Sequence, residues 1–240
     1  MNGESRGRFL RVRENLLRQL TEGMYPGPKL PAEEELARGL STSVATVREV
    51  LRELDREGYI TKRHGSGNYI HRSALGVTMR IDRTRDYGEL LREVYGDVEV
   101  RQSPCRMEPL DPETASRFGI VSGQQVVAYS RVFLARGEPA IYTENRIPAS
   151  RLVRPPEELS GEKTVMEFLR EDCAEEPVQN VVRLIPGTAG DREALKLSLK
   201  KGTPLIACGE TFYNLQDEAV AFASSWFHPE RVDMHLLVKR

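Results

Sequence analysis

The chain has 240 residues, of which 39% are hydrophobic and 30% charged, and its formal net charge is −1. This length suits two modest globular domains, and no apolar run approaches the length of a membrane span. The first residues lack the hydrophobic core of a secretory signal, so we expect a cytoplasmic protein that does not contact membranes.

The three cysteines, Cys105, Cys173 and Cys208, are an odd number and lie far apart in the sequence. This spacing argues against disulfide staples and zinc ribbons and favours three reduced thiols. We therefore expect neither a metal site nor a cofactor.

The charges are unevenly distributed along the chain. Residues 1–72 hold 13 Lys and Arg against 10 Asp and Glu, whereas the remaining residues hold 22 against 26. A small basic domain beside a larger acidic one fits a DNA-binding head and a body with another task.

The first 72 residues follow a pattern of three helices and a hairpin. Apolar residues at helical spacing predict helices over residues 9–20, 31–40 and 46–57. Ser43 is a suitable cap for the third helix, and Gly58 suits a left-handed position at its end. Two short strands, residues 59–62 and 68–71, follow and are joined by the segment Arg63-His64-Gly65-Ser66-Gly67. Glycines at this tip allow positive φ and a close approach to phosphate, so the sequence predicts a winged helix-turn-helix.

Four segments of this head carry a family resemblance: LPAEEELA, SVATVREVL, REGYI and HGSGNYI. They resemble the GntR family of bacterial transcription regulators in both residue type and spacing. The resemblance implies DNA contacts at the start of the third helix and at the wing. With neighbouring basic residues included, the predicted DNA-binding residues are Ser43, Thr46, Arg48, Arg52, Lys62, Arg63, His64, Gly65 and Gly67.

Two positions depart from the family pattern, which usually has Arg where this chain has Glu34 and Val44. A carboxylate repels phosphate, and a valine cannot donate a hydrogen bond to guanine. We therefore expect an unusual operator, weaker DNA binding, or compensation by Arg52, Lys62 and Arg63.

The basic residues of the third helix have a structural alternative. Arg48, Arg52 and Arg56 could form a solvated stripe that pairs with neighbouring glutamates. We favour that interpretation for Arg52 and Arg56, and favour a DNA contact for Arg48 because it lies near the helix N-terminus, the end that enters the groove. A winged helix that binds only protein is a further alternative.

Residues 73–77 are expected to be a linker, and residues 78–240 to form a second domain. Its predicted helices cover residues 87–95, 112–118, 165–170 and 192–199, and its predicted strands cover residues 98–107, 126–135, 140–147, 178–185, 205–214 and 220–227. Hairpin turns are expected at residues 135–139 and 214–218. This order predicts an α+β domain around an antiparallel sheet.

The segments 126–148, 164–172, 191–214 and 219–234 resemble the UTRA effector domain of the HutC-type branch of GntR regulators. The resemblance implies a chorismate-lyase-like fold and a small molecule held against the sheet, often an anionic one. The predicted effector-binding residues are Tyr129, Arg131, Phe133, Glu144, Glu210, Ser224 and Trp226.

Arg131 matches a strand position that commonly holds an anion-binding arginine, whose fork can take a carboxylate or phosphate. Tyr129 and Phe133 share its face because side chains alternate along a strand. The alternative is a structural ion pair between Arg131 and Glu144. For Trp226 we favour core packing over ligand contact, because aromatic residues on strands usually pack in the core.

His228 stands where an arginine is more usual, which argues against a phosphorylated sugar as the ligand. With this exception, the resemblance implies a phosphate, phosphonate, sugar derivative or organic acid as the effector.

The four histidines are scattered, and no Walker A motif or dinucleotide loop is present, so we expect no catalytic residues. The sequence predicts a homodimeric, ligand-responsive repressor released from double-stranded operator DNA by a small molecule. Two alternatives stay open: a chorismate-lyase-like enzyme fused to a winged helix, and a DNA- or protein-binding module without a small-molecule ligand.

Overall fold

A computed structural model describes residues 3–83, 86–118 and 121–239. The chain forms two compact units, Met1–Thr84 with Met234–Arg240, and Arg85–Asp233. We call the first unit the head and the second the body. The packing therefore places the end of the chain with the head, whereas the sequence assigned all residues after 77 to the second domain.

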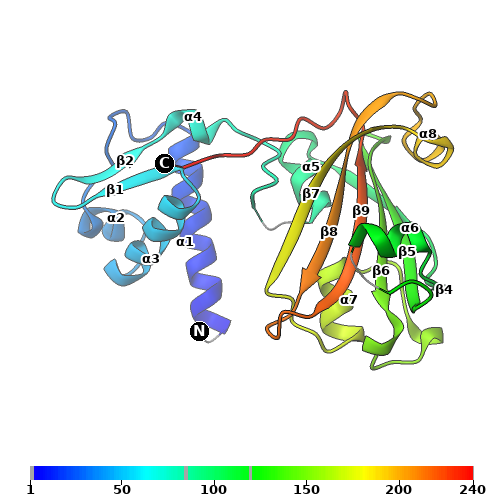
Figure 1. Cartoon of the computed structure of the whole chain (residues 1–240). Coiled ribbons are helices and arrows are strands. Elements are labelled where there is room, and N and C mark those ends of the chain that lie inside the picture. Colours follow the sequence, from blue (N-terminus) through cyan, green and yellow to red (C-terminus); the bar gives the residue numbers. More distant parts are fainter. Residues whose placement is uncertain (1–2, 84–85, 119–120, 240) are drawn as a thin grey trace. The chain divides into compact units, whose positions relative to one another are not determined.

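The head has the predicted order of three helices and a two-stranded hairpin (Figure 1). Its elements are α1 (Gly3–Thr21), α2 (Glu33–Gly39), α3 (Val44–Arg56), β1 (Ile60–Arg63), β2 (Gly67–Ile70) and α4 (Arg72–Leu75). The short helix α4 occupies residues expected to be a linker. That expectation was wrong because Ala74 is buried in the head core, which gives the segment a packing partner.

The core of the head follows from the apolar spacing of its helices. Leu16 of α1 and Val47, Val50 and Leu51 of α3 are completely buried. The Ser43 hydroxyl caps α3 by accepting a hydrogen bond from the backbone N–H of Thr46 at 3.1 Å. Both signals are local, which is why the sequence located this helix correctly.

The end of the chain packs on the head as a strap, Met234–Lys239. Its backbone pairs with residues 79–81, because the N–H of His235 donates to Met79 O and the N–H of Ile81 donates to His235 O. Leu237 packs against the head core, and Lys239 Nζ donates to both the backbone and the carboxylate of Asp55 at 2.7 Å. The strap thus reaches the last turn of α3.

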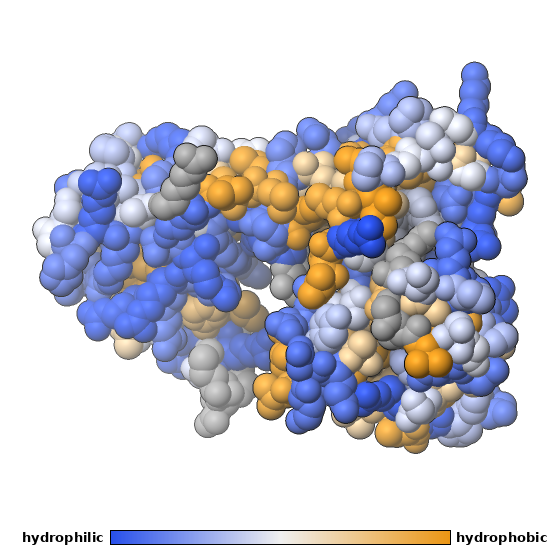
Figure 2. All heavy atoms as spheres, viewed as in Figure 1, coloured by the Kyte–Doolittle hydropathy of each residue, from blue (hydrophilic) through white to orange (hydrophobic). Residues whose placement is uncertain are grey.

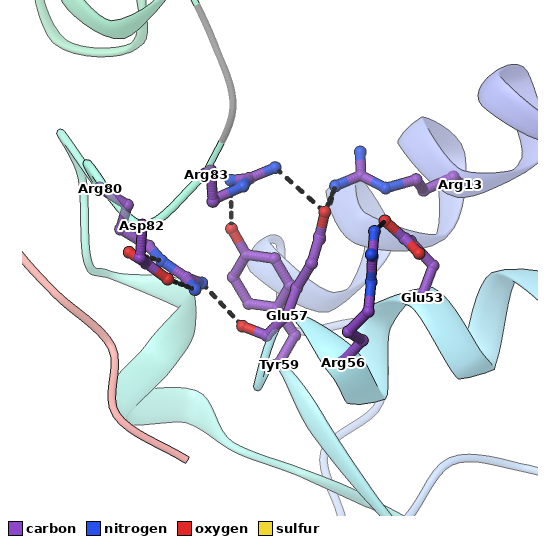
Figure 3. A network of polar contacts seen from close by, with 8 residues as sticks. All are labelled: Arg13, Glu53, Arg56, Glu57, Tyr59, Arg80, Asp82 and Arg83. Carbon is purple, nitrogen blue, oxygen red and sulfur yellow. Dashed lines mark hydrogen bonds and ion pairs between the residues drawn. The ribbon is translucent and has the colours of Figure 1, made fainter. Parts of the chain in front are cut away.

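Residues 80–83 dock at the same place, around the C-terminal end of α3 (Figure 3). Arg80 donates to the backbone oxygen of Glu57 at 2.9 Å and pairs with Asp82. Arg83 donates to the Tyr59 hydroxyl at 2.6 Å, and its guanidinium lies 3.7 Å from the Glu57 carboxylate. Arginine side chains therefore hold residues 80–83 against the C-terminal end of α3.

The body is built on an antiparallel sheet in the order β3-β5-β6-β9-β8-β7, with β4 also paired to β5 (Figure 1). Its strands are β3 (Val98–Gln102), β4 (Arg106–Pro109), β5 (Gln125–Ala135), β6 (Glu138–Pro148), β7 (Gln179–Thr188), β8 (Pro204–Tyr213) and β9 (Ala219–Phe227). The helices are α5 (Tyr87–Tyr95), α6 (Pro112–Phe118), α7 (Val165–Asp172) and α8 (Asp191–Leu197), with short 3-10 turns η1 (Ala149–Arg151) and η2 (Pro156–Glu158). The α+β prediction is confirmed.

Several predicted boundaries in the body differ from the structure, and two of the differences have a clear physical reason. The strand expected over residues 98–107 is divided into β3 and β4, because Pro104 lacks the N–H that a continuous ladder needs. The helix expected to reach residue 199 ends at Leu197, where Ser198 adopts a left-handed conformation. Among the described residues, no helix is both long and apolar enough to cross a membrane.

Candidate functional site

The predicted DNA-binding residues gather at the start of α3 and along the β1–β2 wing. Eight of the nine are exposed, and Thr46 is half-buried. In the wing, Gly65 and Gly67 have φ values of 69° and 111°, which only glycine adopts readily. A Cβ added at either glycine would meet nothing within 4 Å, so the tip can approach a flat or grooved partner closely.

Two of the three basic residues of α3, Arg48 and Arg56, form ion pairs. Arg56 forms an ion pair with Glu53 on the same helix, which is a structural role. Arg52 is exposed one helical turn after Arg48. Arg48 does not pair with the glutamates of its own helix; it pairs with Glu33 of α2.

Glu33 is a residue of this surface that the sequence did not single out. Its carboxylate accepts a hydrogen bond from Arg48 Nε at 2.9 Å and another from Lys62 Nζ at 3.3 Å. Partial burial alone would raise the pKa of Glu33, but these two cationic donors lower it below its usual value. The sequence gave only a weak signal, because Glu33 is one of three glutamates that also suit the first turn of a helix.

The two atypical positions, Glu34 and Val44, border one shallow hollow at the turn between α2 and α3. The hollow is lined by Glu34, Ala37, Arg38, Ser41, Thr42, Ser43 and Val44. Glu34 is exposed and Val44 is half-buried. The departures from the family pattern therefore lie side by side, next to the predicted contact Ser43.

In the body, the cross-strand register brings a row of polar side chains onto one face of the sheet. Arg131 of β5 is aligned with Thr143 of β6, which is aligned with Ser225 of β9. Ser225 is in turn aligned with Cys208 of β8. All four side chains are buried.

Arg131 already has a carboxylate partner on this face. Its Nη1 donates to Asp86, the N-cap of α5, at 3.0 Å, and its guanidinium lies 4.7 Å from the ring centre of Phe133. The Nε group of Arg131 is buried and has no hydrogen-bond partner in the part of the chain that the structure describes. A buried donor without a partner is costly, so this edge of Arg131 is available to an oxygen atom of a ligand.

Glu210 of β8 lies one row away on the same face and is only 8% exposed. It accepts hydrogen bonds from the Tyr87 hydroxyl and from Asn180 Nδ2. Burial raises the pKa of Glu210 despite these donors, and burial followed by the charge of Glu210 raises the pKa of Tyr87. The face therefore gathers the guanidinium of Arg131 and the carboxyl groups of Asp86 and Glu210.

Aromatic rings border the polar rows. Tyr87 packs edge-on against Phe133 and Phe227, with ring centres 6.1 and 5.4 Å apart. Tyr129 stacks on Phe168 of α7 at 5.5 Å, and its hydroxyl is buried without a hydrogen-bond partner. The predicted common face of Tyr129, Arg131 and Phe133 is confirmed by the strand register.

Three other predicted effector residues lie on the opposite face of the sheet. Glu144 is aligned with Ser130 and with Ser224, so both Glu144 and Ser224 point away from Arg131. The expected alternative of an Arg131–Glu144 ion pair was therefore wrong. Glu144 instead pairs with Arg146 and Arg192.

Trp226 is on that opposite face as well and has a packing role. Its ring stacks on Tyr142 with centres 5.2 Å apart, within a core cluster beneath α8. This stack gives Trp226 the packing contact that the sequence predicted.

We call the sheet face that carries Arg131 and Glu210 the polar face. The sequence missed several residues on it or against it: Asp86, Tyr87, Thr143, Asn145, Asn180 and Ser225. Alternation within β6 would have separated Thr143 from Glu144, and alternation within β9 would have separated Ser225 from Ser224. Whether residues of neighbouring strands lie on the same face of the sheet, however, depends on strand register, which spacing within one strand does not reveal.

Comparison with known proteins identifies both units. The UTRA domain family matches residues 97–233, and the family described as bacterial regulatory proteins, gntR family, matches residues 9–70. The chain belongs to the GntR regulators that carry a UTRA domain. These DNA-binding transcriptional regulators join a winged helix to an effector-binding domain, which is the HutC-type arrangement.

Curated relatives of this GntR/UTRA regulator span nearly the whole chain at low identity. The transcriptional regulator YurK of Bacillus subtilis is 20% identical over 96% of this chain and 95% of its own length. A probable fructoselysine utilization operon repressor of Escherichia coli is 21% identical, covering 97% and 95%. The repressor NagR of Bacillus subtilis is 25% identical, covering 93% and 91%.

Solved structures share the fold of this GntR/UTRA regulator. A possible transcriptional regulator, YydK from Bacillus subtilis, superposes with a TM-score of 0.74 at 18% identity, covering 97% of this chain and 99% of that one. PhnF from Mycobacterium smegmatis has a TM-score of 0.57 at 23% identity, covering 95% and 99%.

Proposed function

We propose that this regulator is a repressor that binds operator DNA through α3 and the wing, and leaves it when a small polar molecule occupies the Arg131–Glu210 face. The observation that carries this proposal is the buried Nε group of Arg131, which has no hydrogen-bond partner among the described residues although Nη1 pairs with Asp86, on the same face as Glu210. Such a group is costly in a folded core unless a ligand satisfies it. The names of the relatives NagR and the fructoselysine operon protein support repression.

The polar face suggests the chemistry of the effector. An acidic group, carboxylate, phosphate or phosphonate, would bind Arg131 and replace Asp86 as its partner. Hydroxyl or amino groups would donate to Glu210, as Tyr87 and Asn180 do now. We therefore propose an organic acid, a phosphonate, a phosphate or an acidic sugar derivative.

Chain connectivity supports coupling between effector and DNA. Asp86 and Tyr87 of the polar face follow the segment 80–83 in sequence after an interval of two residues, and that segment contacts Glu57 and Tyr59 at the end of α3. A ligand that displaces Asp86 from Arg131 would free the first turn of α5. This change in α5 would lie only a few residues along the chain from the segment 80–83, which contacts the end of α3.

An enzymatic role has less support on this face. Cys208 is the nucleophilic side chain of the polar row, but burial, followed by the charge of Glu210, raises its pKa to about 12. A thiol with such a pKa is protonated near neutral pH and does not attack substrates. Ligand binding therefore suits this face better than turnover.

The test is a thermal-shift screen of the full chain against phosphates, phosphonates, organic acids and sugars. Compounds that stabilise the protein are then added to its complex with a DNA duplex selected from a random library by the same protein. We expect at least one stabilising compound to release the duplex and to lose both effects in an Arg131→Ala variant. Stabilising compounds that leave DNA affinity unchanged would overturn the proposed coupling.

We also propose that two copies associate along β7, the edge strand of the body sheet. Val181, Val182 and Leu184 of this strand are 58%, 42% and 46% exposed. An edge strand offers unpaired backbone groups on its outer side, and two copies related by a two-fold axis can pair it with itself. Sedimentation should show a dimer that a Val182→Lys variant converts to monomer, whereas a dimer unaffected by that change would place the interface elsewhere.

A further inference from the structure

Glu33 joins the three DNA-facing elements of the head at one carboxylate. It is the first residue of α2, and its partners are Arg48 of the recognition helix α3 and Lys62 of the wing strand β1. One of its oxygens lies 2.9 Å from both Nε and Nη2 of Arg48, and the other lies 3.3 Å from Lys62 Nζ. We call these three residues the Glu33 clamp.

The two cations of the clamp are more exposed than the carboxylate that holds them. The Glu33 side chain is 18% exposed, against 47% for Arg48 and 42% for Lys62. The contact with Glu33 uses one edge of the Arg48 guanidinium and leaves Nη1 for another acceptor. The clamp thus presents positive groups outward while its negative group lies behind them.

Holding these side chains in advance has a physical benefit for recognition. Arg and Lys have long side chains with many rotamers, and part of this conformational entropy is lost when they are fixed on DNA. Two cations side by side also repel, and a shared carboxylate offsets that repulsion. A preformed arrangement therefore favours a matching base sequence, whereas flexible cations would bind any phosphate backbone equally well.

The wing does not depend on Glu33 for its backbone position. The backbone N–H of Lys62 donates to Asp55 at 2.9 Å, and Asp55 is also held by Lys239 of the strap. Removing the Glu33 carboxylate should therefore release the ends of Arg48 and Lys62 without displacing the strand that carries Lys62. This separation allows the role of the carboxylate to be tested without unfolding the head.

We propose that Glu33 is a positioning residue for DNA recognition, which fixes Arg48 and Lys62 in one arrangement and thereby raises the sequence selectivity of the head. The inference rests on the proposed DNA-binding role of α3 and the wing. It assigns a function to a carboxylate on a surface that binds a polyanion, where a negative charge alone would only weaken binding.

The experiment compares two neighbouring charge-neutralising variants, Glu33→Gln and Glu34→Gln, in the full chain. Each variant is titrated with the duplex that the unmodified protein selects and with a scrambled duplex of equal length and composition. Both variants remove one negative charge from the first turn of α2, but only Glu33 contacts Arg48 and Lys62. We expect Glu33→Gln to lower the ratio of the two affinities about tenfold, within the range for loss of one well-placed base contact. For Glu34→Gln, both affinities should rise together, with the ratio changed less than threefold.

A double-variant cycle with Arg48→Ala tests whether Glu33 acts through Arg48. In the Arg48→Ala background, Glu33→Gln should change the selectivity ratio less than threefold. Circular dichroism should show unchanged helix content in every variant.

Two outcomes would overturn the proposal. One is an equal ratio of selected-duplex to scrambled-duplex affinity for the Glu33→Gln variant and the unmodified protein. The other is a tenfold loss of this ratio on Glu33→Gln that persists in the Arg48→Ala background. A protein that enriches no duplex at all would instead refute the proposed DNA-binding function.

Discussion

Replacing Gly58 with alanine should destabilise the head through two separable effects. Gly58 ends α3 with φ of 79°, a conformation that costs a residue with a Cβ about 1 kcal/mol. The new Cβ would also lie 2.5 Å from Leu237 Cδ2 of the strap, so the leucine would have to leave its place. Loss of that partly buried contact adds about 1–2 kcal/mol. The expected total is about 2–3 kcal/mol.

A matched glycine separates the two effects. Gly23 follows α1 with φ of 73°, but a Cβ there would meet nothing within 4 Å. Gly23→Ala should therefore cost only the backbone term, about 1 kcal/mol. In a Leu237→Ala background, Gly58→Ala should fall to the same value as Gly23→Ala.

Urea unfolding followed by far-ultraviolet circular dichroism is the suitable assay, because α1 and α3 dominate the helical signal of the head. Fluorescence is unsuitable for the head, since the single tryptophan, Trp226, lies in the body. Equal losses for Gly58→Ala and Gly23→Ala in the otherwise unmodified chain would show that the strap does not pack on α3.

Three further changes probe the body. Lys163→Met should lower the free energy of unfolding by about 2–3 kcal/mol, because Lys163 pairs with the fully buried carboxylate of Asp172. Of the described ion-pair partners of Asp172, the more distant Arg154 would remain. Urea unfolding followed by Trp226 fluorescence measures the change, and a loss below about 0.5 kcal/mol would contradict this prediction. Glu210→Gln should flatten the fall in stability as pH rises above 4.5. Burial raises the native pKa of Glu210 above that value, so its stabilising contribution is present below the unfolded pKa and is lost as pH rises through the native pKa. Parallel pH profiles for the two proteins would refute that assignment. Arg131→Ala should abolish thermal shifts by acidic compounds, and retained shifts would remove Arg131 from the site.

The strongest sequence predictions concern the head, because its signals are local. Helix periodicity, the Ser43 cap and the glycines of the wing each depend on a few neighbouring residues. The same signals supported the GntR resemblance, which the family comparison confirmed. The expected linker at residues 73–77 failed because the packing of Ala74 depends on distant parts of the head.

The effector site was predicted less completely, for a reason of register. Tyr129, Arg131 and Phe133 were placed on one face by alternation within a single strand. Glu144 and Ser224 were added from neighbouring strands, but pairing puts them on the other face. A shift of one residue reverses the face of every side chain on a strand, so spacing along the sequence could not decide between the two.

By itself, the sequence determined the class of the protein, the order of its elements and the chemistry at the start of the recognition helix. These features depend on short-range preferences of the backbone and on motifs that are contiguous in the chain. Tertiary structure alone decided that Asp86 neutralises Arg131, that Glu33 holds Arg48 and Lys62, and that the strap returns to α3. Each of these contacts joins residues far apart in the sequence, and such pairs form only when the packing of the core has brought their elements together.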